Sequence, residues 1–261
     1  MEEGHPGPPP TWRTRAWSTT VLAGIAVPLL LLLTLSESSS VLASASAPTF
    51  TLALMGVGII GAATAGRFWA GVLLALVNAA CLIVLAVTLG LPALPHPVST
   101  GAAMVIASGS FAARGALFAK TLSHRGWLMA LFVVAGEGSV LLITYAWPGA
   151  LPGWFLALLP AQWASVAIQS SLTGTGALAA APVLIALAGT AATTLLASGL
   201  WLRRWPYALM FTTWLGLSAL VYFFPVTITS GDAAGVRPHL DAPREPGAER
   251  SLPGSPVAAL R

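Results

Sequence analysis

Eight apolar stretches, each about long enough to cross a lipid bilayer, fill this chain between residues 19 and 224. A helix crosses a hydrocarbon layer of ~30 Å with about 20 residues at ~1.5 Å per residue. Of the 261 residues, 56% are apolar and 8% are charged, whereas about 25% of a soluble protein is charged. We therefore predict an all-α fold, a polytopic transmembrane bundle of about eight helices. The predicted helices cover residues 19–35, 49–65, 68–91, 99–119, 126–147, 151–168, 176–202 and 205–224.

The two ends of the chain differ in composition from this apolar region. Residues 1–16 are rich in proline and glycine, and residues 226–261 combine proline and glycine with charged residues. Such segments bury too little apolar surface to offset the entropy of ordering. We predict disordered tails at 1–16 and 226–261, on either side of a transmembrane domain at 17–225.

The first apolar run resembles a signal peptide. Arg13 and Arg15 precede it, and Ala43-Ser44-Ala45 follows it in the small-residue pattern of a cleavage site. The apolar run is long, however, and the serine-rich segment after it is longer than a usual cleavage region. We favour an uncleaved helix; cleavage would leave seven helices.

Orientation follows from the positive residues beside the helices. A cytoplasmic N-terminus puts five of them inside: Arg13, Arg15, Arg67, Lys120 and Arg125. Eight crossings then place Arg203-Arg204 outside, against the rule. Eleven arginines against one lysine, in an alanine-, glycine- and leucine-rich chain, are typical of a GC-rich bacterial genome. We expect a multi-pass protein of the bacterial inner membrane.

The conflict at Arg203-Arg204 disappears if residues 151–168 enter the bilayer and return. Pro160, Gln162 and Gln169 make this segment the weakest of the eight. The segment is nevertheless of full length, so eight crossings remain the favoured prediction and seven the alternative.

Glu137 is the first candidate for a functional side chain. It lies eleven residues after Gly126, the start of its predicted helix, and hence about 16 Å deep. An ionisable group near the midplane suggests a function unless it fastens helices together. Arg114, six residues before Lys120 and so roughly 9 Å deep, either pairs with Glu137 or extends back to the interface.

Asn78 and Gln162 are the other central polar residues. Asn78 lies in the middle of its helix, and Gln162, Ser165 and Gln169 form a stripe on one helix face. Hydrogen bonds between helices, worth roughly 1 kcal/mol each, would explain these residues without any function. Together with Glu137 and Arg114 they are our candidates for a substrate or ion path.

Other kinds of chemistry have less support. The four histidines lie in predicted tails or loops, and the single cysteine, Cys81, excludes a multi-cysteine metal site. We therefore predict no cofactor, no metal and no nucleic-acid partner. A serine nucleophile with a histidine base is also missing from the predicted helices, which makes an enzyme less expected than a non-enzyme.

Three functions remain, in decreasing order of support. The first is a small permease or proton-coupled transporter, with the four candidate residues along its path. The second is a non-catalytic membrane subunit or assembly factor, which would contact a partner or a second copy through small-residue helix faces such as Gly58, Ala62 and Gly66. The third is a membrane-embedded enzyme that acts on an apolar substrate. A transporter would gather the central polar residues around one cavity, and a scaffold would scatter them.

Overall fold

The computed structural model describes residues 11–36, 38–92, 94–173, 180–200 and 205–224, all within one compact unit. These residues form helices and contain no strand, which confirms the predicted all-α bundle. Five helical stretches are long and apolar enough to span a membrane. One of them, Pro97–Ala146, holds two antiparallel helices joined by a short turn. The chain is a multi-pass membrane protein by these criteria.

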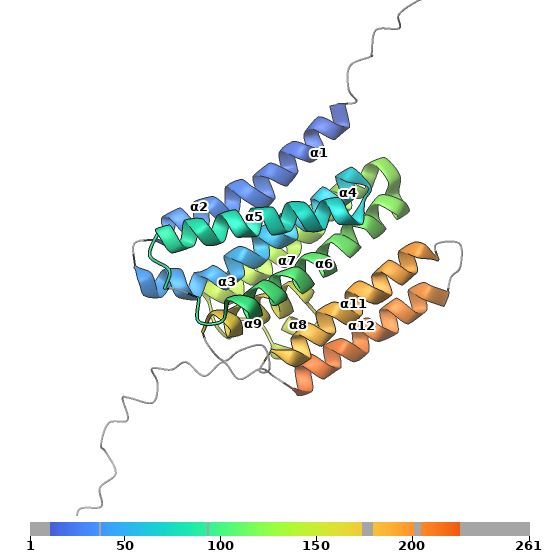
Figure 1. The fold of residues 1–261 in the computed structure, drawn as a ribbon. Coiled ribbons are helices and arrows are strands. Elements are labelled where there is room, and N and C mark those ends of the chain that lie inside the picture. Colours follow the sequence, from blue (N-terminus) through green and yellow to red (C-terminus); the bar gives the residue numbers. More distant parts are fainter. Residues whose placement is uncertain (1–10, 37, 93, 174–179, 201–204, 225–261) are drawn as a thin grey trace, which may run out of the picture. The chain divides into compact units, whose positions relative to one another are not determined.

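Two of the long stretches change from α-helix to π-helix for five residues and back again. Figure 1 shows the course of the helices. The elements in chain order are α1 (Thr11–Val21), η1 (Leu22–Ala26), α2 (Val27–Thr34), α3 (Ser39–Met55), η2 (Gly56–Ile60), α4 (Gly61–Ala65), α5 (Phe68–Thr88), α6 (Pro97–Leu122), η3 (Ser123–Arg125), α7 (Gly126–Ala146), α8 (Gly153–Leu156), α9 (Pro160–Leu172), α11 (Ala181–Gly199) and α12 (Trp205–Phe223).

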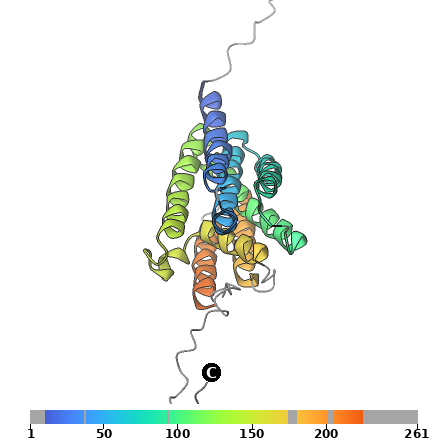
Figure 2. The same cartoon turned by 90° about the vertical axis from the view of Figure 1, so that its left-hand side faces the viewer.

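The helix formed by α3, η2 and α4 lies at the centre of the bundle. Every residue from Thr49 to Thr64 is buried, because α5, α6, α7 and α9 all pack against this helix. Figure 2 shows α7 and α5 on opposite sides of the helices formed by residues 11–65. The core of the protein is therefore built around its second long helix.

Close contact between glycines joins the first helix to this central one. A Cβ atom on Gly56 would lie 2.7 Å from the Cα of Gly24, so the two π-helical segments meet backbone to backbone. Asn78 on α5 donates a hydrogen bond from Nδ2 to the Gly24 carbonyl at 2.8 Å. The first helix is an integral part of the bundle.

Two helices start earlier than predicted. The first begins at Thr11 rather than residue 19, within the segment predicted to be disordered, and the second begins at Ser39 rather than residue 49. The serine-rich segment remains helical because its hydroxyls donate to carbonyls of their own helix, as Thr49 does to Ala45 and Thr51 to Ala47, both at 2.8 Å. Residues 1–10 and 225–261, which include most of both predicted tails, lie outside the described residues.

Helices α6 and α11 are parallel, and their contacts define the two ends of the bundle. Ser110 lies within 3.3 Å of Thr190, and further along both helices Lys120 donates to the Ser198 carbonyl at 2.9 Å. We call these two ends the Lys120 end and the Ser99 end, after residues near the two ends of α6. Helix α7 runs from the Lys120 end toward the Ser99 end, since it follows α6 after three residues.

The segment after α7 enters the bundle and returns, a course that fits the alternative of seven crossings. It is broken at residues 157–159, between α8 and α9. Helix α9 starts beside Glu137, the middle of α7, and ends with Ser171 hydrogen-bonded to Ser99 at 3.1 Å. Both ends of residues 151–172 therefore face the Ser99 end (Figure 1). Pro160 explains the break, because proline cannot donate to the preceding turn and is well placed at a helix start.

Seven helical stretches thus cross the bundle in the described residues: α1–α2, α3–α4, α5, α6, α7, α11 and α12. Helix α11 ends at the Lys120 end. Arg203 and Arg204, which follow α11 in the sequence, lie outside the described residues. With seven crossings, the charge count no longer requires an exception at this pair.

Candidate functional site

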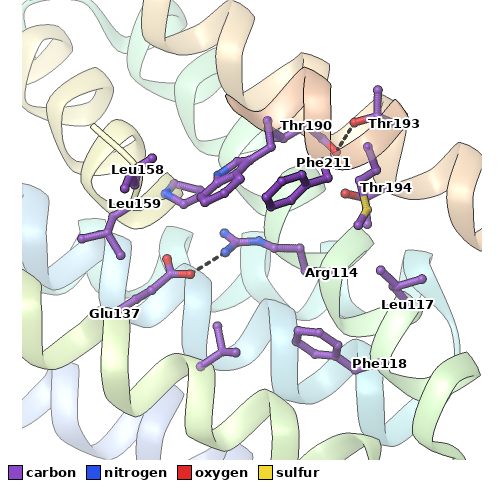
Figure 3. A pocket seen from close by; sticks show the side chains of 14 residues that line it. Arg114, Leu117, Phe118, Glu137, Leu158, Leu159, Thr190, Thr193, Thr194 and Phe211 are labelled. Carbon is purple, nitrogen blue, oxygen red and sulfur yellow. Dashed lines mark hydrogen bonds and ion pairs between the residues drawn. The ribbon is translucent and has the colours of Figure 1, made fainter. Parts of the chain in front are cut away.

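Arg114 on α6 and Glu137 on α7 form an ion pair inside the bundle. Nη1 of Arg114 lies 2.7 Å from Oε1 of Glu137, and the two side chains are 16% and 11% exposed. Figure 3 shows them pointing toward one another from neighbouring helices. Of the two alternatives for Arg114, pairing and extension to the interface, the structure has the pairing.

The second carboxylate oxygen of Glu137 binds the start of α9. Oε2 accepts a hydrogen bond from the backbone N–H of Ala161 at 3.1 Å. Ala161 is the second residue of α9, and the residue before this helix, Leu159, provides no side-chain cap. A helix start carries unpaired N–H groups and a partial positive charge. Glu137 therefore neutralises two positive features at once, the guanidinium of Arg114 and the N-terminus of a helix that begins within the bundle.

Arg114 keeps unused donors on the side that does not bind Glu137. Its Nε and Nη2 atoms are buried and have no hydrogen-bond partner among the described residues. The guanidinium carbon lies 4.9 Å from the ring centroid of Phe111, which is a cation–π contact. Burying a donor without a partner costs about 1–3 kcal/mol, so an acceptor that reached these two atoms would bind favourably.

A cavity of about 340 Å³ opens beside the pair. Its walls come from α6, α7, α11, α12 and the break between α8 and α9 (Figure 3). Arg114 and Glu137 are the ionisable groups among the lining residues, and three threonines of α11 add hydroxyls. The lining residues are Arg114, Leu117, Phe118, Val133, Glu137, Leu158, Leu159, Pro160, Thr190, Thr193, Thr194, Met210, Phe211 and Trp214. The cavity thus combines an apolar wall with one buried charge pair.

Only two of the four predicted path residues, Arg114 and Glu137, line this cavity. Asn78 lies away from it and binds the Gly24 carbonyl. Gln162 directly follows Ala161, but it lines two other cavities, one of them together with Ser165 and Gln169. The role of the four as a substrate or ion path stays a prediction; two of them lie together in the site, and Asn78 acts in helix packing.

Trp163 holds the broken segment in place, a role that the sequence did not reveal. It is almost fully buried, and its Nε1 donates to the Ala157 carbonyl at 2.9 Å. This bond connects α9 to the break at 157–159. A tryptophan well inside a predicted helix, three residues after a proline, was the available signal for this contact.

The small-residue faces predicted for a partner are largely occupied within the chain. A Cβ atom on Gly58 would lie 3.2 Å from Phe111, whereas one on Gly66 would meet nothing within 4 Å. Ala62 is fully buried. Gly58 and Ala62 therefore pack within the bundle, whereas Gly66 is exposed.

Among the described residues, no three His, Cys, Asp or Glu side chains gather as a metal site would require. The chain matches no family model, no curated protein and no solved structure. The geometry of the Arg114–Glu137 site is therefore the basis of any functional assignment.

Proposed function

We propose that this membrane protein is a small proton-coupled permease, in which the Arg114–Glu137 cavity binds the solute and Glu137 carries the proton. One observation carries the proposal: a largely buried ion pair lies between apolar helices, beside a cavity and at the start of a helix that begins inside the bundle. Ionisable groups at this depth commonly mark transport pathways. Helices that start within the membrane are a recurring feature of transporter binding sites.

The alternative role of the pair, fastening helices together, accounts for less of the site. A buried ion pair adds little stability compared with apolar residues of the same size, and α6, α7 and α9 already pack through buried apolar side chains. A role in fastening helices also does not explain why the Nε and Nη2 atoms of Arg114 lack a partner, or why Arg114 lines a cavity. A solute-binding role explains both the cavity and the unused donors.

Proton transfer at Glu137 would couple directly to the shape of the site. The ionised carboxylate holds Arg114 on one oxygen and Ala161 on the other. A protonated carboxyl keeps one acceptor and loses its charge, so it would bind both partners more weakly. Release of the α9 start would then alter the cavity, since Leu158, Leu159 and Pro160 line it.

The scaffold hypothesis is the second candidate, because Asn78 serves helix packing rather than the site. Gly58 and Ala62 of its proposed contact face, however, pack against the chain's own helices. We therefore rank it below the permease.

The proposal is tested in proteoliposomes that contain a pH-sensitive dye. Solutes of several classes, such as carboxylates, amino acids, sugars and monovalent cations, are added outside, and the internal pH is recorded. We expect one class to change the internal pH through the wild-type protein and the change to be lost in Glu137→Gln. Lys120→Gln is the control: it removes a charge from α6 that does not line the cavity, and should leave the flux unchanged. The proposal would be overturned if the proton flux persisted in Glu137→Gln. It would also be overturned if no class of solute changed the internal pH through the wild-type protein.

A further inference from the structure

We infer that the solute is a small, mainly apolar monocarboxylate whose carboxylate binds the unused edge of Arg114. This inference rests on the proposed function and names its substrate class. It follows from the donor geometry, the burial of the site and the composition of the cavity wall.

The free donors of Arg114 match a carboxylate in number and placement. Nη1 binds Glu137, while Nε and Nη2 have no partner among the described residues. The N–H groups of Nε and Nη2 share one edge of the planar guanidinium. Such an edge binds the two oxygens of a carboxylate in parallel, with geometry that a lysine cannot reproduce. The structure therefore leaves two donors on one guanidinium edge without a partner, on a residue that lines the cavity, with Glu137 bound elsewhere on the same group.

Charge balance explains why Glu137 and the solute would act together. Arg114 and Glu137 compensate each other at present, and they are the ionisable residues among those that line the cavity. A bound carboxylate would add one negative charge, which is expensive to bury without compensation. Protonation of Glu137 restores neutrality. One proton would thus enter the site with each carboxylate, and Arg114 would exchange one anionic partner for another.

The rest of the cavity fits an apolar body of limited size. Leu158, Leu159, Met210, Phe211 and Trp214 form much of the wall, and Figure 3 labels three of them, Leu158, Leu159 and Phe211. A volume of about 340 Å³ lies at the lower end of the range for small-molecule sites, about 300–1,000 Å³. An aromatic or short aliphatic acid fits this description.

A phosphate group could also use a guanidinium edge, but depth argues against a phospholipid headgroup. Arg114 lies six residues, or roughly 9 Å along α6, from Lys120, and α6 continues beyond Lys120 to Leu122. A headgroup would have to leave the interface to reach it. We therefore commit to the carboxylate and make the phosphate an outcome of the test.

The test measures binding of radiolabelled benzoate and hexanoate to the purified full-length protein in lipid nanodiscs. Unlabelled hexanoate, benzamide, inorganic phosphate and a short-chain phosphatidic acid serve as competitors. We expect saturable binding that hexanoate displaces and that benzamide, which has the same shape without the charge, does not. Arg114→Lys, which keeps the charge opposite Glu137, should weaken binding by about tenfold or more, and Lys120→Gln should leave it unchanged.

Four outcomes would overturn the inference. They are the absence of saturable binding, equal displacement by benzamide, displacement by phosphate or phosphatidic acid in preference to hexanoate, and an unchanged affinity in Arg114→Lys. Proton uptake in weakly buffered solution is the second readout: we expect one proton per bound benzoate in the wild type and none in Glu137→Gln. Uptake that persists in Glu137→Gln would contradict the charge exchange.

The two proposals fail in different ways. If another solute drives proton flux in proteoliposomes while benzoate does not bind, the carboxylate assignment is wrong and the permease stands. If benzoate binds as expected but no solute changes the internal pH, the site is correct and the permease is wrong.

Discussion

The carboxylate of Glu137 on α7 accepts a hydrogen bond from the backbone N–H of Ala161, the second residue of α9. A side chain of one helix thus caps the start of another, which lacks a side-chain cap of its own. The same carboxylate binds Arg114 through its other oxygen. Three elements meet at one group, so substitutions there should be strongly coupled.

Stability measurements on single and double mutants test this coupling. Arg114→Gln should lower the free energy of unfolding by about 3 kcal/mol or more, because it leaves Glu137 buried without its partner. The double mutant Arg114→Gln/Glu137→Gln should recover much of this loss, since no uncompensated charge remains. Unfolding in mixed detergent micelles provides the measurement. Strictly additive losses would show that the two residues do not interact.

Trp163→Phe should loosen the segment that enters the bundle. The change removes the hydrogen bond to the Ala157 carbonyl and leaves a buried acceptor unpaired, at a cost of about 1–3 kcal/mol. Hydrogen exchange should rise at residues 153–160. Trp154→Phe is the control, because Trp154 is largely exposed. An equal response of the two variants would argue against the structural role of Trp163.

Cysteine labelling tests the course of the same segment. With Cys81 replaced by alanine, single cysteines at Ala150, Thr173 and His96 should react from one side of the membrane, and one at His124 from the other. All four native positions are exposed. We expect His124, near Lys120, on the cytoplasmic side. Labelling of Ala150 and Thr173 from opposite sides would restore the eighth crossing.

Gly56→Ala should destabilise the bundle by about 1–3 kcal/mol through overpacking. The added methyl group would lie 2.7 Å from the Cα of Gly24. Because this is a backbone atom, the two helices would have to move apart to relieve the contact. The same change at Gly136 meets nothing within 4 Å, and should be neutral or stabilising because alanine favours helix. Similar unfolding free energies for the two variants would contradict the close contact of η1 and η2.

The sequence predicted those features of the fold and site that depend on hydropathy and on position along a helix. The apolar runs predicted the helices, and counting residues along α6 and α7 placed Arg114 roughly 9 Å and Glu137 about 16 Å deep, a difference that a long arginine side chain can span. Contacts between residues far apart in the chain could not be predicted from the sequence. Nothing in the sequence around Asn78 indicates that its amide binds Gly24, because that contact depends on how two helices cross.

The broken segment shows the same limit. Pro160, Gln162 and Gln169 marked residues 151–168 as irregular, but hydropathy alone does not distinguish a helix that crosses from one that returns. The Ser99–Ser171 hydrogen bond, between residues 72 positions apart, decides the matter. The early start of α3 was missed for another reason: its serines and threonines count as polar, although their hydroxyls are satisfied by the helix backbone.

The position of α3 has a consequence for biosynthesis. This helix is the second to leave the ribosome, yet its neighbours α6, α7 and α9 are made later. Until they arrive, the faces of α3 that bear Ser46, Thr49 and Thr51 must lie against lipid or insertion machinery. Hydroxyls bonded to their own backbone make this exposure tolerable. The helix on which the finished bundle is built is thus made before most of the helices that bury it.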